Sequence, residues 1–134
     1  MSAEEREDVA TLPQRLDTLG VTHLSEWDVL SFLYRHAASL CTATQIATFV
    51  GYDKAETGAA LNRLESLGLI ERSRISLGIR IYQFSEPAES GRHSSLIELM
   101  HLSQDRAGRL LVLKHLKSHR HEPLRTRDSG LRLA

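Results

Sequence analysis

The order of helix-starting and helix-ending residues between 42 and 68 constrains the fold more than any other feature of the sequence. Thr42, followed three residues later by Gln45, has the pattern of a capping box, which starts a helix. Gly51 ends that helix, and Asp53 is placed to cap a second one directly after the turn. Gly68 closes the second helix. Two short helices joined by a tight turn are therefore predicted.

The segments on either side of this pair complete a recognisable unit. Trp27 and Leu30 belong to an apolar stripe at helical spacing, which predicts a helix over 25–39. Residues 70–75 and 79–84 have the composition of strands and are joined by a short glycine-containing connection of hairpin length. The predicted order is one helix, two capped helices and a hairpin.

The two ends of the chain are predicted to add helices to this core. A short helix is expected over 13–19 with a frayed segment before it, because Pro13 is costly inside a helix. A capping pattern at Ser95 opens a long helix that is expected to run to Ser118, and the residues beyond are polar and basic. The predicted parts are an N-terminal arm at 1–24, the core domain at 25–87, the long helix at 88–118 and a disordered basic tail at 119–134.

Composition restricts the class of protein. The 134 residues suit one domain with a single core, and the apolar runs are shorter than the roughly 20 residues of a membrane span. The formal net charge is zero, which does not favour strong nonspecific DNA binding, although cations gather over 106–134. A single cysteine and an N-terminus without a secretory signal predict a cytoplasmic protein that makes no contact with membranes.

The middle of the chain resembles winged helix-turn-helix regulators of the MarR and ArsR type. The resemblance is carried by Thr44-Gln45-Ile46-Ala47, by Gly51-Tyr52-Asp53 and by Leu61-Asn62-Arg63-Leu64-Glu65-Ser66-Leu67-Gly68-Leu69-Ile70-Glu71-Arg72. It implies a mainly α fold with a small β-hairpin, the wing, flanked by terminal helices in a homodimer. It also implies the function of a bacterial-type transcription regulator that binds double-stranded DNA.

The resemblance further implies which residues meet DNA, since the second helix of such a motif lies in the major groove and the wing reaches phosphates or the minor groove. The expected DNA-binding residues are Thr44, Lys54, Ala55, Glu56, Ala59, Asn62 and Arg63 on the helices, and Arg72, Arg74 and Arg80 in the wing. Ala55, Gly58 and Ala59 are small, and no arginine stands in the first turns of the second helix. A winged-helix module that binds a protein and no DNA is therefore the alternative.

The long terminal helix predicts a second copy of the chain as a partner, because so small a core cannot cover its whole apolar stripe. The expected dimerisation residues are Leu96, Leu99, Met100, Ala107, Leu110 and Leu111. The alternative is a helix that folds back over its own domain, with 13–19 completing the cover. A pocket between the core and the dimer helices would suit a small-molecule effector, but no residue marks one.

No sequence motif indicates catalysis, a cofactor or a metal. The chain has no P-loop, GxSxG or HExxH motif, so no enzyme, catalytic residue or cofactor is predicted. His115 and His119 share a helix face at a spacing that can hold zinc, but no cysteine or carboxylate supports them, and a cationic helix end is preferred. Cys41 precedes a helix N-terminus, where a thiol can become reactive; a core role is preferred over a redox switch.

Overall fold

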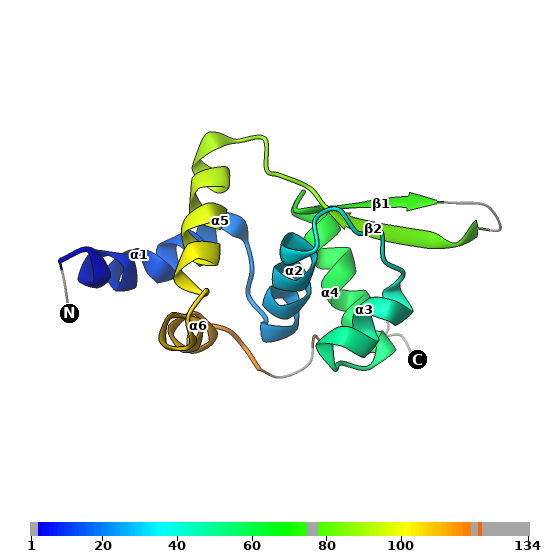
Figure 1. Cartoon of the computed structure of the whole chain (residues 1–134), viewed down its shortest axis with the longest axis horizontal. Helices are drawn as coiled ribbons and strands as arrows, with labels where there is room; N and C mark the ends of the chain where they lie inside the picture. The colour runs from blue at the N-terminus through cyan, green and yellow to red at the C-terminus, as the bar shows by residue number, and fades with distance from the viewer. Residues whose placement is uncertain (1–2, 75–77, 119–120, 122–134) are drawn as a thin grey trace, which may run out of the picture.

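The fold is a bundle of helices with one projecting hairpin, seen in a computed structural model that describes residues 3–74, 78–118 and 121. The elements are α1 (Ala3–Leu19), α2 (Leu24–Arg35), α3 (Ala43–Val50), α4 (Lys54–Ser66), β1 (Ile70–Arg74), β2 (Arg80–Phe84), α5 (Ser90–Leu102) and α6 (Arg106–Leu113). Figure 1 shows α2, α3 and α4 in the middle, the hairpin extending from one end and α1 at the opposite end. The predicted class, mainly α with a small hairpin and flanking terminal helices, is confirmed.

The two capped helices form where their local signals place them. The Gln45 backbone N–H donates to Thr42 Oγ1 at 3.2 Å, and the Thr42 N–H donates to Gln45 Oε1 at 2.9 Å. Gly51 ends α3 in the left-handed conformation with φ of 84°. Asp53 Oδ1 then accepts from the Glu56 N–H at 2.8 Å and starts α4. Each cap thus completes its hydrogen bonds within one turn, which explains why the sequence pattern predicts both helices.

The hairpin is anchored to the core by a third stretch of chain. β1 and β2 pair antiparallel with Arg72 opposite Tyr82. The Tyr82 N–H donates to the Cys41 carbonyl at 2.7 Å, and the Cys41 N–H donates back at 3.3 Å. The loop before α3 is therefore bonded to the middle of β2, so that the wing and the helix pair keep a defined relative position. The predicted hairpin connection at 76–78 lies outside the described residues except for Gly78.

Cys41 belongs to the core, as preferred on sequence grounds. Its side chain is 8% exposed, and burial raises the pKa of its thiol. Because the thiolate is the reacting species, each unit of pKa increase removes about nine tenths of it at neutral pH.

Alkylation of Cys41 by iodoacetamide at pH 7.5 is expected to be at least about ten times slower in the folded protein than in urea-unfolded protein. The chain has one cysteine, so mass spectrometry counts the modification without ambiguity. Equal rates in the two states would show that the thiol is accessible and would contradict its place in the core.

The first helix is longer than predicted. α1 begins at Ala3 and continues through Pro13, whereas the sequence predicted a helix only over 13–19. Its apolar residues Leu12, Leu16 and Leu19 are buried, and α1 packs along α5. Proline removes one hydrogen bond from the helix, and the burial of this leucine stripe offsets that loss.

The predicted single long helix is wrong, because the chain turns a corner between α5 and α6. α5 starts at Ser90, α6 ends at Leu113, and residues 103–105 separate them. Asp105 Oδ1 accepts from the Gly108 N–H at 2.7 Å and caps α6. An aspartate that can cap a new helix competes with continuation of the old one, which explains the break.

The corner changes the role of several residues predicted to form a dimer contact. Leu96, Leu99 and Met100 are buried in their own subunit, where α5 covers α1. The structure therefore supports, for α5, the alternative of a helix folded back over its own domain. Ala107 and Leu110 on α6 are exposed, and Leu111 is half-buried.

No helix in the described part of the chain is both long and apolar enough to cross a bilayer.

Candidate nucleic-acid interface

The outward face of α4 is the centre of the candidate interface. Ala55 and Asn62 are exposed and Ala59 is half-buried, and their spacing places them on one side of the helix. On the opposite side, Leu61 and Leu64 are in the core. The outward face is thus uncharged and made of small side chains, which lets the helix backbone approach another surface closely.

Two residues predicted to meet DNA have charged groups that are bonded within their own subunit. Glu56 is 7% exposed and accepts a hydrogen bond from the Ser25 hydroxyl. Arg63 donates from Nη2 to the Gly20 carbonyl at 2.7 Å and from Nε to Glu26 Oε2 at 3.3 Å. The structure contradicts the prediction for Glu56, because its carboxylate is buried. The Arg63 side chain is 41% exposed, so a contact of Arg63 with DNA remains a prediction.

The remaining predicted residues lie around the α4 face. Thr44 is exposed in the first turn of α3, and Arg80 is exposed at the start of β2. Arg72 Nε lies 3.4 Å from Glu65 Oε2, a half-exposed ion pair that links the wing to α4. The backbone of Arg74 pairs with Arg80, while the Arg74 side chain is outside the described part of the structure. Lys54 is also exposed at the start of α4.

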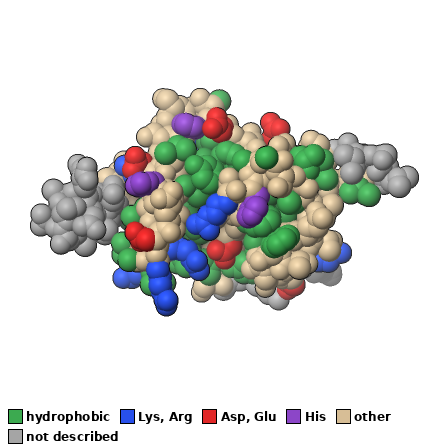
Figure 2. Space-filling view, viewed as in Figure 1, with side chains coloured by type: hydrophobic (Ala, Val, Ile, Leu, Met, Phe, Trp, Pro, Cys, Tyr) green, Lys and Arg blue, Asp and Glu red, His purple; other side chains and the backbone are tan. Residues whose placement is uncertain are grey.

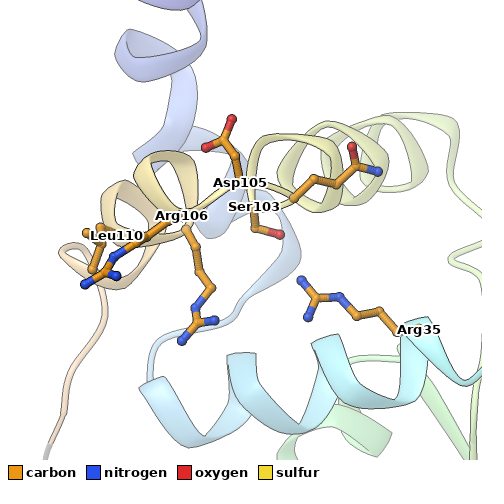
Figure 3. A pocket seen from close by; sticks show the side chains of 7 residues that line it. Arg35, Ser103, Asp105, Arg106 and Leu110 are labelled. Carbon is orange, nitrogen blue, oxygen red and sulfur yellow. The ribbon is translucent and has the colours of Figure 1, made fainter.

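A cationic groove lies on a different face, at the corner between α5 and α6. Figure 2 shows lysine and arginine side chains gathered over this region of the surface, and Figure 3 shows Arg35 projecting from α2 toward the corner. The groove has a volume of about 510 Å³ and is lined by Arg35, Ser103, Gln104, Asp105, Arg106, Arg109 and Leu110. It attracts anions by its charge. Sequence reasoning missed it because one continuous helix leaves no corner.

A second feature missed from sequence is a buried cluster of charged and polar side chains behind α4. His121 places Nδ1 2.6 Å from Glu56 Oε2 and Nε2 2.6 Å from Glu26 Oε2. The ring of His23 stacks on that of His121 with centroids 3.9 Å apart. Burial by itself would raise the pKa of Glu26, but hydrogen bonds from the Thr22 backbone, His121 and Arg63 outweigh it and lower that pKa.

Glu56 behaves in the same way as Glu26. Its burial favours the neutral acid, while hydrogen bonds from Ser25 and from the backbone and ring of His121 have the larger combined effect and lower its pKa. Both carboxyl groups are therefore ionised at neutral pH.

Of the histidine pair considered from sequence, His115 is exposed with Nδ1 3.0 Å from the Leu111 carbonyl, and His119 is outside the described residues.

Comparison with known proteins agrees with this architecture. Residues 19–76 match the model of the MarR family. The solved structure of a mutant of S. aureus MepR bound to an oligodeoxyribonucleotide is 19% identical, with 82% of this chain and 84% of that chain covered and a TM-score of 0.53. A MarR family transcriptional regulator from Silicibacter pomeroyi is 16% identical, with 82% and 77% covered and a TM-score of 0.47. Curated protein sequences give no match. The family match spans α2 to β1, which include the helix pair and the first strand of the hairpin, so this part of the chain is similar to the MarR family and has the fold of a winged helix-turn-helix.

Proposed function

We propose that this protein is a transcription regulator that binds double-stranded DNA through α4 and the wing. The observation that carries the proposal is the outward face of α4, built of small side chains and standing beside an arginine-bearing hairpin. The match of residues 19–76 to the MarR family supports it, as does the likeness in fold to MepR, which was solved with an oligodeoxyribonucleotide.

Each residue of the interface has a role set by its chemistry. Asn62 offers an amide that can pair with adenine in the major groove, and the small residues beside it admit the helix. Lys54 and the N-terminal end of α3 at Thr44 suit phosphates, since free backbone N–H groups at a helix start favour anions. Arg72 and Arg80 extend the cationic contact along the wing.

The proposed regulator acts as a homodimer in the cytoplasm, and it regulates transcription rather than catalysing a reaction. Two copies of α4 about 34 Å apart would enter successive major grooves. Ile97 on α5 and Leu110 on α6 are large apolar side chains that remain 37% and 52% exposed. Together with Ala107 and Leu111 they replace the buried residues of α5 as the proposed dimer contacts.

The wing arginines are expected to contribute to DNA affinity through phosphate contacts. In the double variant Arg72→Ala and Arg80→Ala, the slope of log affinity against log salt concentration is expected to fall by about 2, because each phosphate contact contributes about 0.9. Fluorescence anisotropy with a duplex selected from a random pool by the wild-type protein measures the slope. Asn62→Ala is expected to relax base preference and leave the slope unchanged.

Arg15→Ala provides the matched control, because it removes an arginine from α1, at the end of the molecule opposite the wing (Figure 1). The control should keep the wild-type slope. If the folded wild-type protein binds no duplex even at low salt, DNA binding is refuted and the protein-binding alternative takes its place.

A further inference from the structure

The strongest unassigned feature of the molecule is the buried cluster behind α4. His23 caps α2, Glu26 lies in the first turn of α2, and His121 follows α6, so distant parts of the chain supply the donors. One ligand atom from each of these residues lies within 4.8 Å of the other two. The side chains of His23, Glu26 and His121 are only 16%, 0% and 11% exposed, so water competes weakly for them.

We propose that His23, Glu26 and His121 form a binding site for a zinc-type divalent metal ion, and that this ion holds α4 in the position that binds DNA. The second half of the proposal rests on the proposed function, whereas the first half does not. Two imidazoles and one carboxylate are a donor set suited to Zn²⁺, Co²⁺ or Ni²⁺ rather than to Mg²⁺ or Ca²⁺.

The distances fit a tetrahedral site with one open position. Zinc–ligand bonds of about 2.0–2.2 Å place tetrahedral ligand atoms about 3.3 Å apart. His23 Nδ1 lies 3.4 Å from Glu26 Oε2, which matches this separation. His121 Nε2 lies 2.6 Å from the same oxygen and has to move outward by less than about 1 Å to admit the ion. Thr22 Oγ1, now 2.8 Å from His23 Nδ1, gives up that contact.

Glu56 supplies the support that a metal-binding histidine needs. Its Oε2 lies 2.6 Å from His121 Nδ1, and its Oε1 accepts from the His121 backbone N–H at 3.1 Å. Metal-binding histidines commonly donate their second ring N–H to a carboxylate, which fixes the tautomer and the ring orientation. When Nδ1 of His121 carries the ring proton and donates to Glu56, Nε2 presents its lone pair to the Glu26 carboxylate, and these two acceptors repel each other. A cation placed between Nε2 and the carboxylate is coordinated by both, which removes the repulsion.

The backbone also brings His121 to this position. The Leu24 N–H donates to the Lys117 carbonyl at 2.8 Å, and the Lys117 N–H donates to the Thr22 carbonyl at 2.9 Å. These bonds fasten the segment after α6 to the start of α2. His121, four residues further on, therefore reaches the cluster from a fixed point.

The cluster is tied to α4 by two side chains. Glu56 lies in the first turn of α4, and Arg63, on the same helix, donates to Glu26. An ion bound to Glu26 and His121 thus holds in place the partner of Arg63 and the partner of Glu56, and it reduces the motion of α4. A helix that is already ordered loses less entropy when it enters the major groove, so the metal is expected to tighten DNA binding.

Metal titration of the full chain tests the site directly. Chelator-treated protein is titrated with Co²⁺, whose absorption reports tetrahedral coordination, and with Zn²⁺ in competition with a chromophoric chelator. One ion per chain is expected. His23→Gln and His121→Gln should each abolish the cobalt spectrum, while Glu56→Gln should weaken zinc affinity by about 10–100-fold, because it changes only the partner of His121.

Two surface histidines serve as controls. His36→Gln and His115→Gln alter exposed residues outside the cluster and should bind as the wild type does. Circular dichroism establishes that each variant is folded. Absence of binding by the wild type overturns the proposal. Retained binding in both His23→Gln and His121→Gln, or its loss in His115→Gln, also overturns it.

The effect on DNA is measured separately. Zinc is expected to tighten DNA binding of the wild type by about fivefold or more and to leave His121→Gln unchanged. An unchanged wild-type affinity refutes the coupling to α4. DNA binding by the zinc-loaded wild type decides the proposed function, whereas the ratio of its zinc-loaded to its metal-free affinity decides the coupling, so the two failures are distinguishable.

Discussion

Replacing Gly108 by alanine is expected to lower the free energy of unfolding by about 1–3 kcal/mol or more, as overpacking against backbone does. A Cβ at this position would lie 1.8 Å from the Leu102 carbonyl oxygen and 2.9 Å from its carbonyl carbon. The clash is with main chain, so no side-chain rotation relieves it. Relief requires opening the corner between α5 and α6, which the Asp105 cap holds closed.

Gly58→Ala is the matched control, with the opposite expected sign. Gly58 lies inside α4, and no atom outside the local helix backbone lies within 4 Å of a Cβ added there. Alanine should therefore raise the free energy of unfolding by about 0.5–1 kcal/mol, the ordinary difference between the two residues in a helix. Urea unfolding followed by far-ultraviolet circular dichroism measures both variants.

The two glycine variants test different parts of the structure. Wild-type stability in Gly108→Ala would refute the tight corner at the start of α6. A loss of stability in Gly58→Ala would mean that another part of the molecule covers the outward face of α4, which would also remove the basis of the proposed DNA interface.

Leu64→Ala is expected to lower the free energy of unfolding by about 2–5 kcal/mol. Leu64 is fully buried on the inner side of α4, which packs against α2 and α3. Removing its side chain takes away apolar burial and leaves a cavity in a small core. Because domains of this size have about 5–15 kcal/mol of stability in total, the variant should unfold at much lower urea concentration.

Leu40→Ala makes the same chemical change at the surface. Leu40 is 56% exposed in the loop before α3, so its replacement should alter stability by no more than about 0.5 kcal/mol. Equal losses in the two leucine variants would contradict the assignment of Leu64 to the core and Leu40 to the surface.

Local signals in the sequence were enough to predict the helix pair and the hairpin. The side chains of Thr42, Gln45 and Asp53 complete hydrogen bonds within three residues of themselves, and Gly51 takes a backbone conformation that few other residues adopt. Such interactions depend on the adjacent chain alone, so they can be predicted before any tertiary contact is known.

The same reasoning failed where a local pattern allowed two outcomes. Asp105 can cap a helix or lie on the exposed side of one, and the four polar residues at 103–106 can form either a break or the exposed turn of a continuous helix. The carbonyl of Leu102 packs against Gly108, and this contact is available only once the corner has formed. The exposed position predicted for Glu56 is likewise wrong, because contacts with Ser25 and His121 hold this side chain inside.

The sequence by itself determined which segments become helices and strands across the winged core, because caps, turn glycines and apolar spacing act over one or two turns. Only the tertiary structure decided the corner after α5, the burial of Glu56, and the meeting of His23, Glu26 and His121. These features join residues that are far apart in the chain, and their contacts depend on the path that the backbone takes between them.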